Sequence, residues 1–141
     1  MHCVSTVYMN FRACLFRALT VGWMALIFFL SSRPDVAAPD LFWQQDKMAH
    51  LLVFGVLGLL LAFSLTPPAV ATWRRLFLIT AFVTAYGVTD ELHQYFVPGR
   101  EASIWDVLAD GVGGFLAALT RSPMWSGSRR TRRRAGAGPA G

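Results

Sequence analysis

The sequence predicts an all-α integral membrane protein in which four helices form one bundle with short loops. Of the 141 residues, 55% are hydrophobic, a share above that of an ordinary soluble domain. These residues come in blocks, each close to the length that a helix needs to cross about 30 Å of hydrocarbon. The chain suffices for one domain, predicted at residues 1–125. The basic tail that follows, residues 126–141, has the composition of a disordered segment.

The first predicted span is residues 13–31, an almost wholly apolar stretch interrupted only by Arg17. Residues 1–12 are predicted to be a short, weakly polar lead. A cleaved signal peptide is the alternative for this stretch. The cleavage site it would need is poor, and the apolar run is long for a signal peptide. A transmembrane helix is therefore the preferred interpretation.

The second and third spans are predicted at residues 48–65 and 76–95, and the fourth at residues 103–119. The segment 32–47, which precedes the second span, is polar and reads as a loop. Pro98-Gly99-Arg100 predicts a tight turn, because proline presets φ and glycine tolerates positive φ. The fourth span is the least hydrophobic of the set.

The distribution of positive charge predicts that both termini are cytoplasmic. Arginines precede the first span, join the second to the third and follow the fourth, whereas the cations of the other two loops are offset by acids. Cytoplasmic loops carry the excess of Lys and Arg, so segments 32–47 and 96–102 are predicted to face outward. Aromatic belts would then place Trp43 and Trp105 at the outer interface, and Trp73 and Trp125 at the inner one.

This topology gathers polar side chains from three spans at the outer end of the bundle, and helical spacing puts them on single faces. In the fourth span, Asp106, Asp110, Gly114 and Ala118 recur every fourth residue. Small residues allow close helix packing in lipid, so we expect the polar ends to surround a pocket open to the outer surface. The faces of the other two spans are Lys47, His50, Phe54, Gly58 and Ala62, and Thr80, Thr84, Gly87, Glu91 and Gln94.

The predicted binding residues follow from these faces and from the turn. A charged group at mid-membrane costs about 2.5–3.5 kcal/mol and is a functional-site candidate by default. Asp110 lies deepest, and its charge is expected to be met by a neighbouring cation or removed by protonation. The cations that could meet it are Lys47, Arg100 and His50. The full set is Lys47, His50, Glu91, Gln94, Arg100, Asp106 and Asp110.

Structural roles stay open for several of these residues. Ser103 and Asp106 have the spacing of a capping box, and Asp46 suits a helix cap. Lys47 fits an interfacial snorkel, and His50 fits an ordinary hydrogen-bonded histidine. Two further groups near the end of the third span, Asp90 and His93, fit solvated positions.

Several function classes find no support in the sequence. The two cysteines, Cys3 and Cys14, lack partners at ligand spacing, so neither a disulfide framework nor a zinc site is predicted. No Ser or Cys nucleophile pattern and no H-E-x-x-H motif occurs. We therefore predict no cofactor and no dedicated metal motif. The arginine-rich tail is interpreted as a topology signal that contacts anionic lipid, and nucleic acid is not a predicted partner.

Five short motifs resemble the VanZ-like family of small bacterial membrane proteins, over residues 28–119. They are F-F-L-S-S, D-K-M-A-H, E-L-H-Q, P-G-R and D-V-L-A-D-G-V-G-G. One departure is Asp110, where the family usually has Asn. The resemblance implies a polytopic cell-envelope protein of the bacterial cytoplasmic membrane. The family's founding member is linked to resistance to the glycopeptide teicoplanin.

Three functions are compatible with these residues, and whether the protein is an enzyme stays open. In the first, the pocket binds or modulates a lipid-linked or cell-wall head group, with Arg100 suited to a phosphate or carboxylate. In the second, Glu91 or Asp106 is a general base and His50 an acid/base in a membrane enzyme, or the carboxylates and the histidine hold a divalent metal. In the third, Asp106 and Asp110 relay protons or ions. Expected partners are membrane lipids, a lipid-linked cell-wall precursor and a second copy of the chain.

Overall fold

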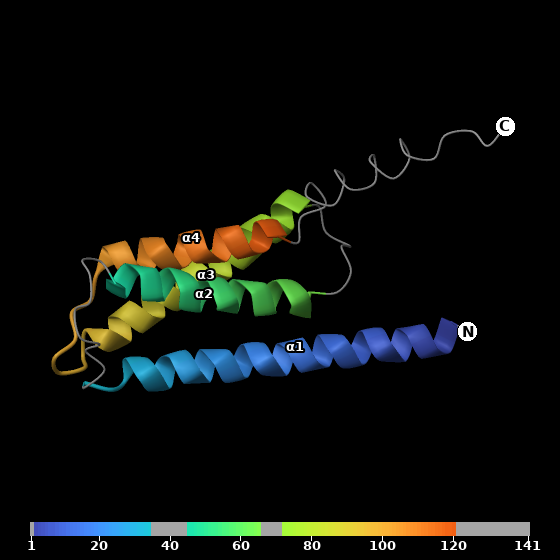
Figure 1. Cartoon of the computed structure of the whole chain (residues 1–141), viewed down its shortest axis with the longest axis horizontal. Coiled ribbons are helices and arrows are strands. Elements are labelled where there is room, and N and C mark those ends of the chain that lie inside the picture. The colour runs from blue at the N-terminus through green and yellow to red at the C-terminus, as the bar shows by residue number, and fades with distance from the viewer. Residues whose placement is uncertain (1, 35–44, 66–71, 121–141) are drawn as a thin grey trace.

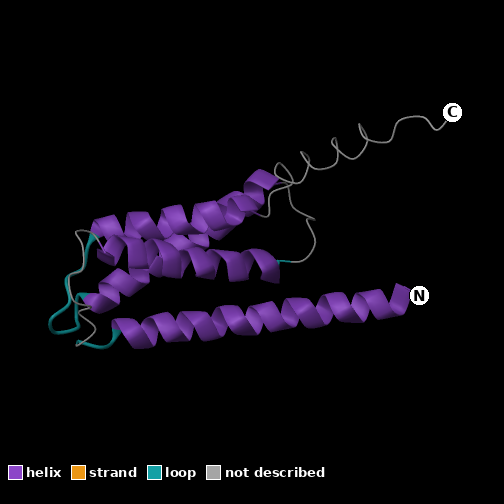
Figure 2. Ribbon diagram, viewed as in Figure 1, coloured by secondary structure: helices purple, strands orange, loops and turns teal. Residues whose placement is uncertain are grey.

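The computed structural model describes residues 2–34, 45–65 and 72–120, and within these the chain forms four α-helices and no strand (Figure 2). The bounds lie close to the predicted spans at most ends. They are α1 His2–Ser31, α2 Gln45–Ser64, α3 Thr72–Gln94 and α4 Ile104–Thr120. The predicted tail, residues 126–141, and the belt residues Trp43 and Trp125 lie outside the described residues.

The helices α1 and α3 begin earlier than predicted, because no helix-breaking residue stands just before the predicted starts. Residues 1–12 were expected to be a lead, but α1 begins at His2, and no Gly or Pro occurs before Gly22. Likewise α3 begins at Thr72, so the basic residues expected between spans are helical. The guanidinium of Arg75 donates a hydrogen bond to the Ala62 carbonyl on α2, which satisfies an acceptor that a helix C-terminus leaves free.

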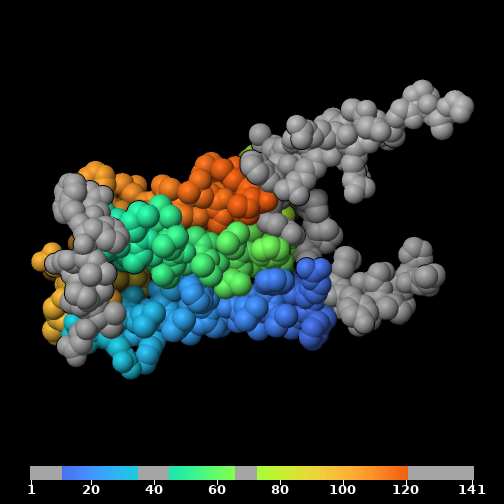
Figure 3. All heavy atoms as spheres, in the orientation of Figure 1, coloured from blue at the N-terminus to red at the C-terminus, as the bar shows by residue number. Residues whose placement is uncertain are grey.

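The helices alternate in direction along one long axis (Figure 1). α1 begins and α4 ends at the same end of the molecule, and the described turn between α3 and α4 lies at the other end. α2 packs most extensively on α4, while α1 lies along α2 (Figure 3). Residues from α2, α3 and α4 therefore meet in one interior, and α1 covers one side of it.

Small residues set how closely α2, α3 and α4 approach. A Cβ built on Gly58 of α2 would lie 2.9 Å from Ala117 Cβ and 3.0 Å from Gly114 Cα on α4. A Cβ on Gly114 would lie 2.8 Å from Val83 Cβ on α3. These separations are shorter than real Cβ contacts, so the glycines are required by close packing, as expected for helices in lipid. The predicted faces are the ones that meet.

Two long-range hydrogen bonds fasten α1 to the other helices. Trp23 Nε1 donates to the Val53 carbonyl on α2 at 3.0 Å. Tyr86 Oη on α3 donates to the Met24 carbonyl at 2.7 Å. Interhelical hydrogen bonds in membranes contribute about 0.6 kcal/mol each on average, so these two fix the position of α1 more than they add stability.

The turn before α4 has the predicted geometry. Arg100 N donates to Val97 O at 3.1 Å, and Gly99 has a φ of 83°. A glycine with positive φ after a proline is the pattern of a type II turn. The tight reversal places the start of α4 beside the end of α3.

Large apolar side chains are exposed on the outer surface of all four helices. Two segments, Phe11–Ser31 and Gln45–Ser64, are long and apolar enough to cross a membrane. On α3 and α4, large side chains such as Phe77 (67% exposed), Leu92 (60%) and Ile104 (68%) point outward. A soluble monomer rarely exposes apolar patches this extensive, so the surface is that of a membrane protein.

Candidate functional site

A group of five polar side chains lies where α2 and α4 begin and α3 ends. We call Lys47, His50, Glu91, Asp106 and Asp110 the polar cluster. Its centre is a contact between His50 Nδ1 and Asp110 Oδ1 at 3.0 Å. Asp110 is fully buried, with 0% exposure. Of the three partners that the sequence offered for Asp110, His50 is the one in contact with it.

The tautomer of His50 follows from this contact. When Asp110 is ionised it only accepts hydrogen bonds, and Nδ1 then carries the proton of the hydrogen bond between them. The Nε2 atom then points to the other side of the ring, where Glu91 Oε1 lies 3.8 Å away. The ring itself stacks on Phe54, with 5.8 Å between centroids and 6° between planes. The His50 ring therefore lies between the carboxylates of Asp110 and Glu91, and Phe54 separates it from the apolar interior.

Glu91 also forms the link between α3 and the start of α4. Its Oε2 atom accepts a hydrogen bond from Ser103 N at 2.7 Å. In turn, Ser103 Oγ accepts from Trp105 N at 3.3 Å, as an N-cap residue does. The sequence predicted a capping box in which Asp106 returns a bond to the Ser103 backbone. Glu91 of another helix makes that bond, so Asp106 is left free to face the cluster.

Asp106 completes the cluster next to Lys47. Asp106 Oδ1 lies 3.7 Å from Lys47 Nζ, which is an ion pair but is too long for a hydrogen bond. Asp106 is 6% exposed, whereas the Lys47 side chain is 36% exposed. The lysine thus covers the cluster from the solvent side, and its flexible stem allows the ammonium to move away.

The Asp110 carboxylate packs directly against the backbone of Gly87 on α3. A Cβ built on Gly87 would lie 2.3 Å from Asp110 Oδ2 and 3.0 Å from its Cβ and Cγ. Only a residue without a side chain leaves room for the carboxylate at this position. The depth of Asp110 in the bundle therefore depends on a glycine of the preceding helix.

Three carboxylate oxygens of the cluster are buried without a hydrogen-bond donor among the described residues. They are Glu91 Oε1, Asp106 Oδ1 and Asp110 Oδ2. Leaving a buried acceptor unsatisfied costs about 1–3 kcal/mol, and more for a charged group. Such atoms in a native structure point to an unseen partner. The cluster can thus accept hydrogen bonds from a ligand or coordinate a cation.

The predicted site residues Gln94 and Arg100 lie outside this cluster. Gln94 Nε2 donates to Asp90 Oδ2 at 2.9 Å, and both side chains are buried. Arg100 was expected between the acidic helices, but its Nη2 donates to the Leu30 carbonyl of α1 at 3.4 Å. The turn at Gly99 carries the guanidinium toward α1, and its Nε has no partner among the described residues.

Of the two residues predicted to be solvated, Asp90 is buried and His93 is half-buried. Asp90 is 4% exposed because it pairs with Gln94. His93 Nε2 lies 2.9 Å from Ser32 Oγ, and its ring packs on Phe28 with 4.5 Å between centroids. Asp46, by contrast, is exposed in the first turn of α2, where a negative charge suits the helix dipole.

The chain matches the model of a known protein family. A family model described as VanZ/LLP1 matches residues 16–122, which include most of α1 and all of α2, α3 and α4. The chain belongs to the VanZ-like family. Comparisons with curated proteins and with solved structures gave no match.

In this VanZ-like chain, the motifs that carry the resemblance divide between two places. The D-K-M-A-H segment supplies Lys47 and His50, and the D-V-L-A-D segment supplies Asp106 and Asp110, all in the polar cluster. The E-L-H-Q segment contributes to both places, since Glu91 joins the cluster and Gln94 pairs with Asp90. The P-G-R and F-F-L-S-S segments meet at the end of α1, where Arg100 reaches Leu30.

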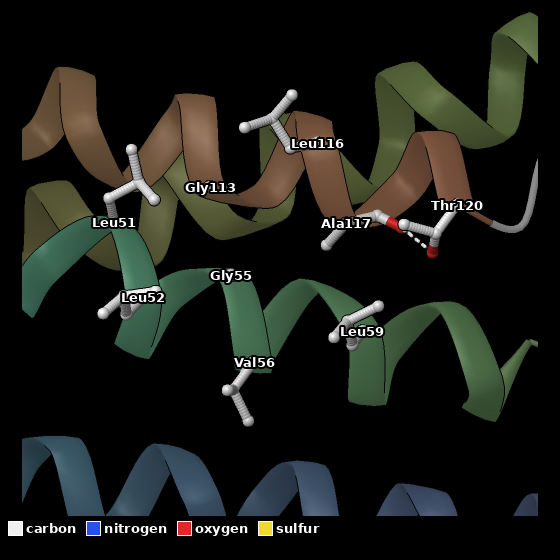
Figure 4. A pocket seen from close by; sticks show the side chains of 9 residues that line it. All are labelled: Leu51, Leu52, Gly55, Val56, Leu59, Gly113, Leu116, Ala117 and Thr120. Carbon is white, nitrogen blue, oxygen red and sulfur yellow. Dashed lines mark hydrogen bonds between the residues drawn. The ribbon is translucent and has the colours of Figure 1, made fainter. Parts of the chain in front are cut away.

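An apolar hollow of the VanZ-like bundle lies between α2 and α4, apart from the cluster (Figure 4). It contains none of the cluster residues, and its floor is formed by close contacts at Gly55 and Gly113. The expected polar pocket is thus not the hollow seen here. The residues that line the hollow are Leu51, Leu52, Gly55, Val56, Leu59, Gly113, Leu116, Ala117 and Thr120.

Sequence reasoning missed two partners in the site. Ser103 was read as a helix cap, which its hydroxyl is, but the hydrogen bond from its amide to Glu91 was not foreseen. Ser32 was read as part of a polar loop, yet it contacts His93. The position of Ser32 inside the F-F-L-S-S motif was the available signal for the second. No local pattern indicated the first, because the bond joins residues of different helices.

Proposed function

We propose that this VanZ-like protein spans the bacterial cytoplasmic membrane four times, with both termini in the cytoplasm and the polar cluster at the outer end. The outward-facing apolar side chains of α3 and α4 support two spans beyond those that hydropathy identifies. The starts of α1 and α3 lie at the end opposite the cluster (Figure 1), and these segments carry Arg12 and Arg17 on α1 and Arg74 on α3. Arginines favour the cytoplasmic side, which leaves the cluster outside.

We further propose that this outer end binds the head group of a lipid-linked or cell-wall molecule. The observation that carries this is the set of unpartnered buried atoms at one end of the bundle. Glu91 Oε1 and Asp106 Oδ1 are acceptors, whereas Arg100 Nε is a donor. A head group with both a phosphate and hydroxyl or amine groups offers partners of both kinds. The arginine fork suits phosphate, and the carboxylates suit the hydroxyls or amines.

Ligand binding in nanodiscs tests this proposal. Purified protein would be titrated with a polyprenyl-pyrophosphate-linked cell-wall precursor and, separately, with phosphatidylglycerol. Arg100→Ala should lose precursor binding, by about tenfold or more for a charge-assisted contact. Arg33→Ala is the matched control, because Arg33 lies at the same end but is exposed and stacks on Phe29 at 4.4 Å. Equal binding by wild type and Arg100→Ala would refute the assignment.

A membrane-embedded acid/base enzyme is the second candidate, and the bond between His50 and Asp110 favours it. A carboxylate that orients an imidazole and fixes its tautomer is the usual support of a histidine base. Glu91 Oε1, 3.8 Å from Nε2, would occupy the place of the second acid or base. If the protein turns over a lipid-linked substrate, His50→Gln should abolish turnover and leave binding within a few-fold. Turnover by His50→Gln at the wild-type rate would exclude this role.

The proposed ligand also connects the chain to the teicoplanin resistance of the family's founding member. If the site holds a cell-wall head group, expression in a susceptible host should change the teicoplanin concentration that stops growth. The Arg100→Ala variant, expressed to the same level, should not. If the teicoplanin concentration that stops growth is unchanged while precursor binding is intact, the site recognises the head group without conferring resistance.

A further inference from the structure

The polar cluster contains the donor set of a metal site, and its atoms are already close together. One ligand atom from each of His50, Glu91 and Asp106 lies within 4.8 Å of the others. These residues come from α2, α3 and α4, so the grouping is made by helix packing and not by a local motif. A tetrahedral ion about 2.0–2.2 Å from each atom would need a pair that is 4.8 Å apart to close by roughly 1.4 Å.

We infer that His50, Glu91 and Asp106 bind one divalent first-row transition-metal ion, such as Mn²⁺ or Zn²⁺. Acidic groups gathered at a helix end would not be sufficient evidence. The independent observation is that Glu91 Oε1 and Asp106 Oδ1 lack hydrogen-bond donors among the described residues, although their side chains are only 8% and 9% exposed. Neither oxygen has the hydrogen bond that a buried carboxylate requires, and the ion pair of Asp106 with Lys47 is 3.7 Å long. A cation among these oxygens supplies the missing partner.

The tautomer of His50 points to the same place. In the tautomer that donates from Nδ1 to Asp110, at 3.0 Å, Nε2 is an acceptor and lies 3.8 Å from Glu91 Oε1. Two acceptors this close repel unless a cation or proton lies between them. Metal-bound histidines almost always donate their second ring N–H to a carboxylate or carbonyl. Asp110 is therefore the orienting partner of the ligand His50 and not itself a ligand.

The charge balance of the cluster favours a divalent ion. Glu91, Asp106 and Asp110 bring three carboxylates, and Lys47 is the ammonium paired with them, at 3.7 Å from Asp106. With His50 neutral, the cluster carries excess negative charge in an interior that disfavours it. A histidine nitrogen beside two carboxylates suits Mn²⁺ or Zn²⁺ better than Mg²⁺ or Ca²⁺, which prefer oxygen. The inference goes beyond the head-group proposal and stands if no head group binds.

Mn²⁺ alone is the probe for the test, because the thiol of the exposed Cys14 is a soft ligand that would compete for Zn²⁺. The full chain in nanodiscs, stripped with chelator, would be titrated with Mn²⁺ by calorimetry and by electron paramagnetic resonance. Wild type should bind one ion per chain. Glu91→Gln and Asp106→Asn should each weaken binding at least 100-fold. Asp46→Asn, an exposed acid at the same end of α2, is the matched control and should bind as wild type does.

Two further measurements keep the test decisive if the ligand variants fold poorly. Pulsed resonance on Mn²⁺-loaded wild type should detect a directly bonded nitrogen, which is the signature of His50. Asp110→Ser, which removes the carboxylate that contacts His50 Nδ1, should weaken binding 10- to 100-fold, as loss of an orienting partner does. Absence of stoichiometric binding, absence of the nitrogen signal, or wild-type affinity in both ligand variants would overturn the inference.

Discussion

Replacement of Gly87 by alanine should disrupt the polar cluster without touching any of its side chains. The new Cβ would lie 2.3 Å from Asp110 Oδ2, whereas ordinary contact begins at 3.4 Å. The carboxylate must therefore move by about 1 Å, and a displacement of that size breaks its 3.0 Å bond to His50. Neither helix can yield easily, because Gly114 is already tight against Val83.

The expected loss of stability has two sources, the overpacking at the new Cβ and the lost hydrogen bond between Asp110 and His50. Overpacking a well-packed interior costs about 1–3 kcal/mol, and losing a hydrogen bond to a charged group costs about 1.5–3 kcal/mol. The helix preference of alanine over glycine returns about 0.8–1 kcal/mol. Because the displaced carboxylate relaxes part of the overlap, the net loss in free energy of unfolding should be about 2–3 kcal/mol.

Reversible unfolding in mixed micelles, followed by tryptophan fluorescence, measures this loss. Gly22→Ala is the matched control, because nothing lies within 4 Å of a Cβ built there, and it should be as stable as wild type or slightly more so. The cost of Gly87→Ala should also largely disappear in an Asp110→Ser background, where the carboxylate is gone. Wild-type stability of Gly87→Ala, or the same cost in both backgrounds, would refute the reasoning.

Further predictions concern single contacts and the topology. Glu91→Ala should lower the free energy of unfolding by about 1–2 kcal/mol, because the backbone amide that begins α4 loses its acceptor; unchanged unfolding would mean that this bond is dispensable. Asp110→Asn should cost less than Asp110→Ala, since the amide oxygen still accepts from the imidazole, and the reverse order would contradict that contact. Tyr86→Phe should cost about 0.6 kcal/mol and increase protease access to α1, whereas unaltered digestion would argue that α1 is held by packing alone. In a background without other cysteines, Arg33→Cys should react with a membrane-impermeant thiol reagent on intact cells and Arg74→Cys should not; labelling in the opposite order would invert the proposed orientation.

The sequence by itself determined the helices, their buried faces and the turn. Apolar blocks of membrane length marked all four helices, and the period of 3.6 residues marked the row from Asp106 to Ala118 as one face. Those residues are buried. Pro98 followed by Gly99 was sufficient for the turn, since that conformation depends on local backbone sterics alone. The extra turns at the start of α1 were missed because the start of the span was assigned from the polarity of residues 1–12. No helix-breaking residue occurs there, so the helix continues to His2.

Only the tertiary structure decided which polar groups meet. The sequence offered His50, Lys47 and Arg100 as partners of Asp110, and the structure selects His50 and directs Arg100 toward α1. Helical periodicity specifies the face of a helix, but not how far one helix slides along its neighbour. That offset is set by the close contacts at Gly58 and Gly87, where the absence of a side chain leaves room for atoms of α4. These contacts join residues that are distant in the chain.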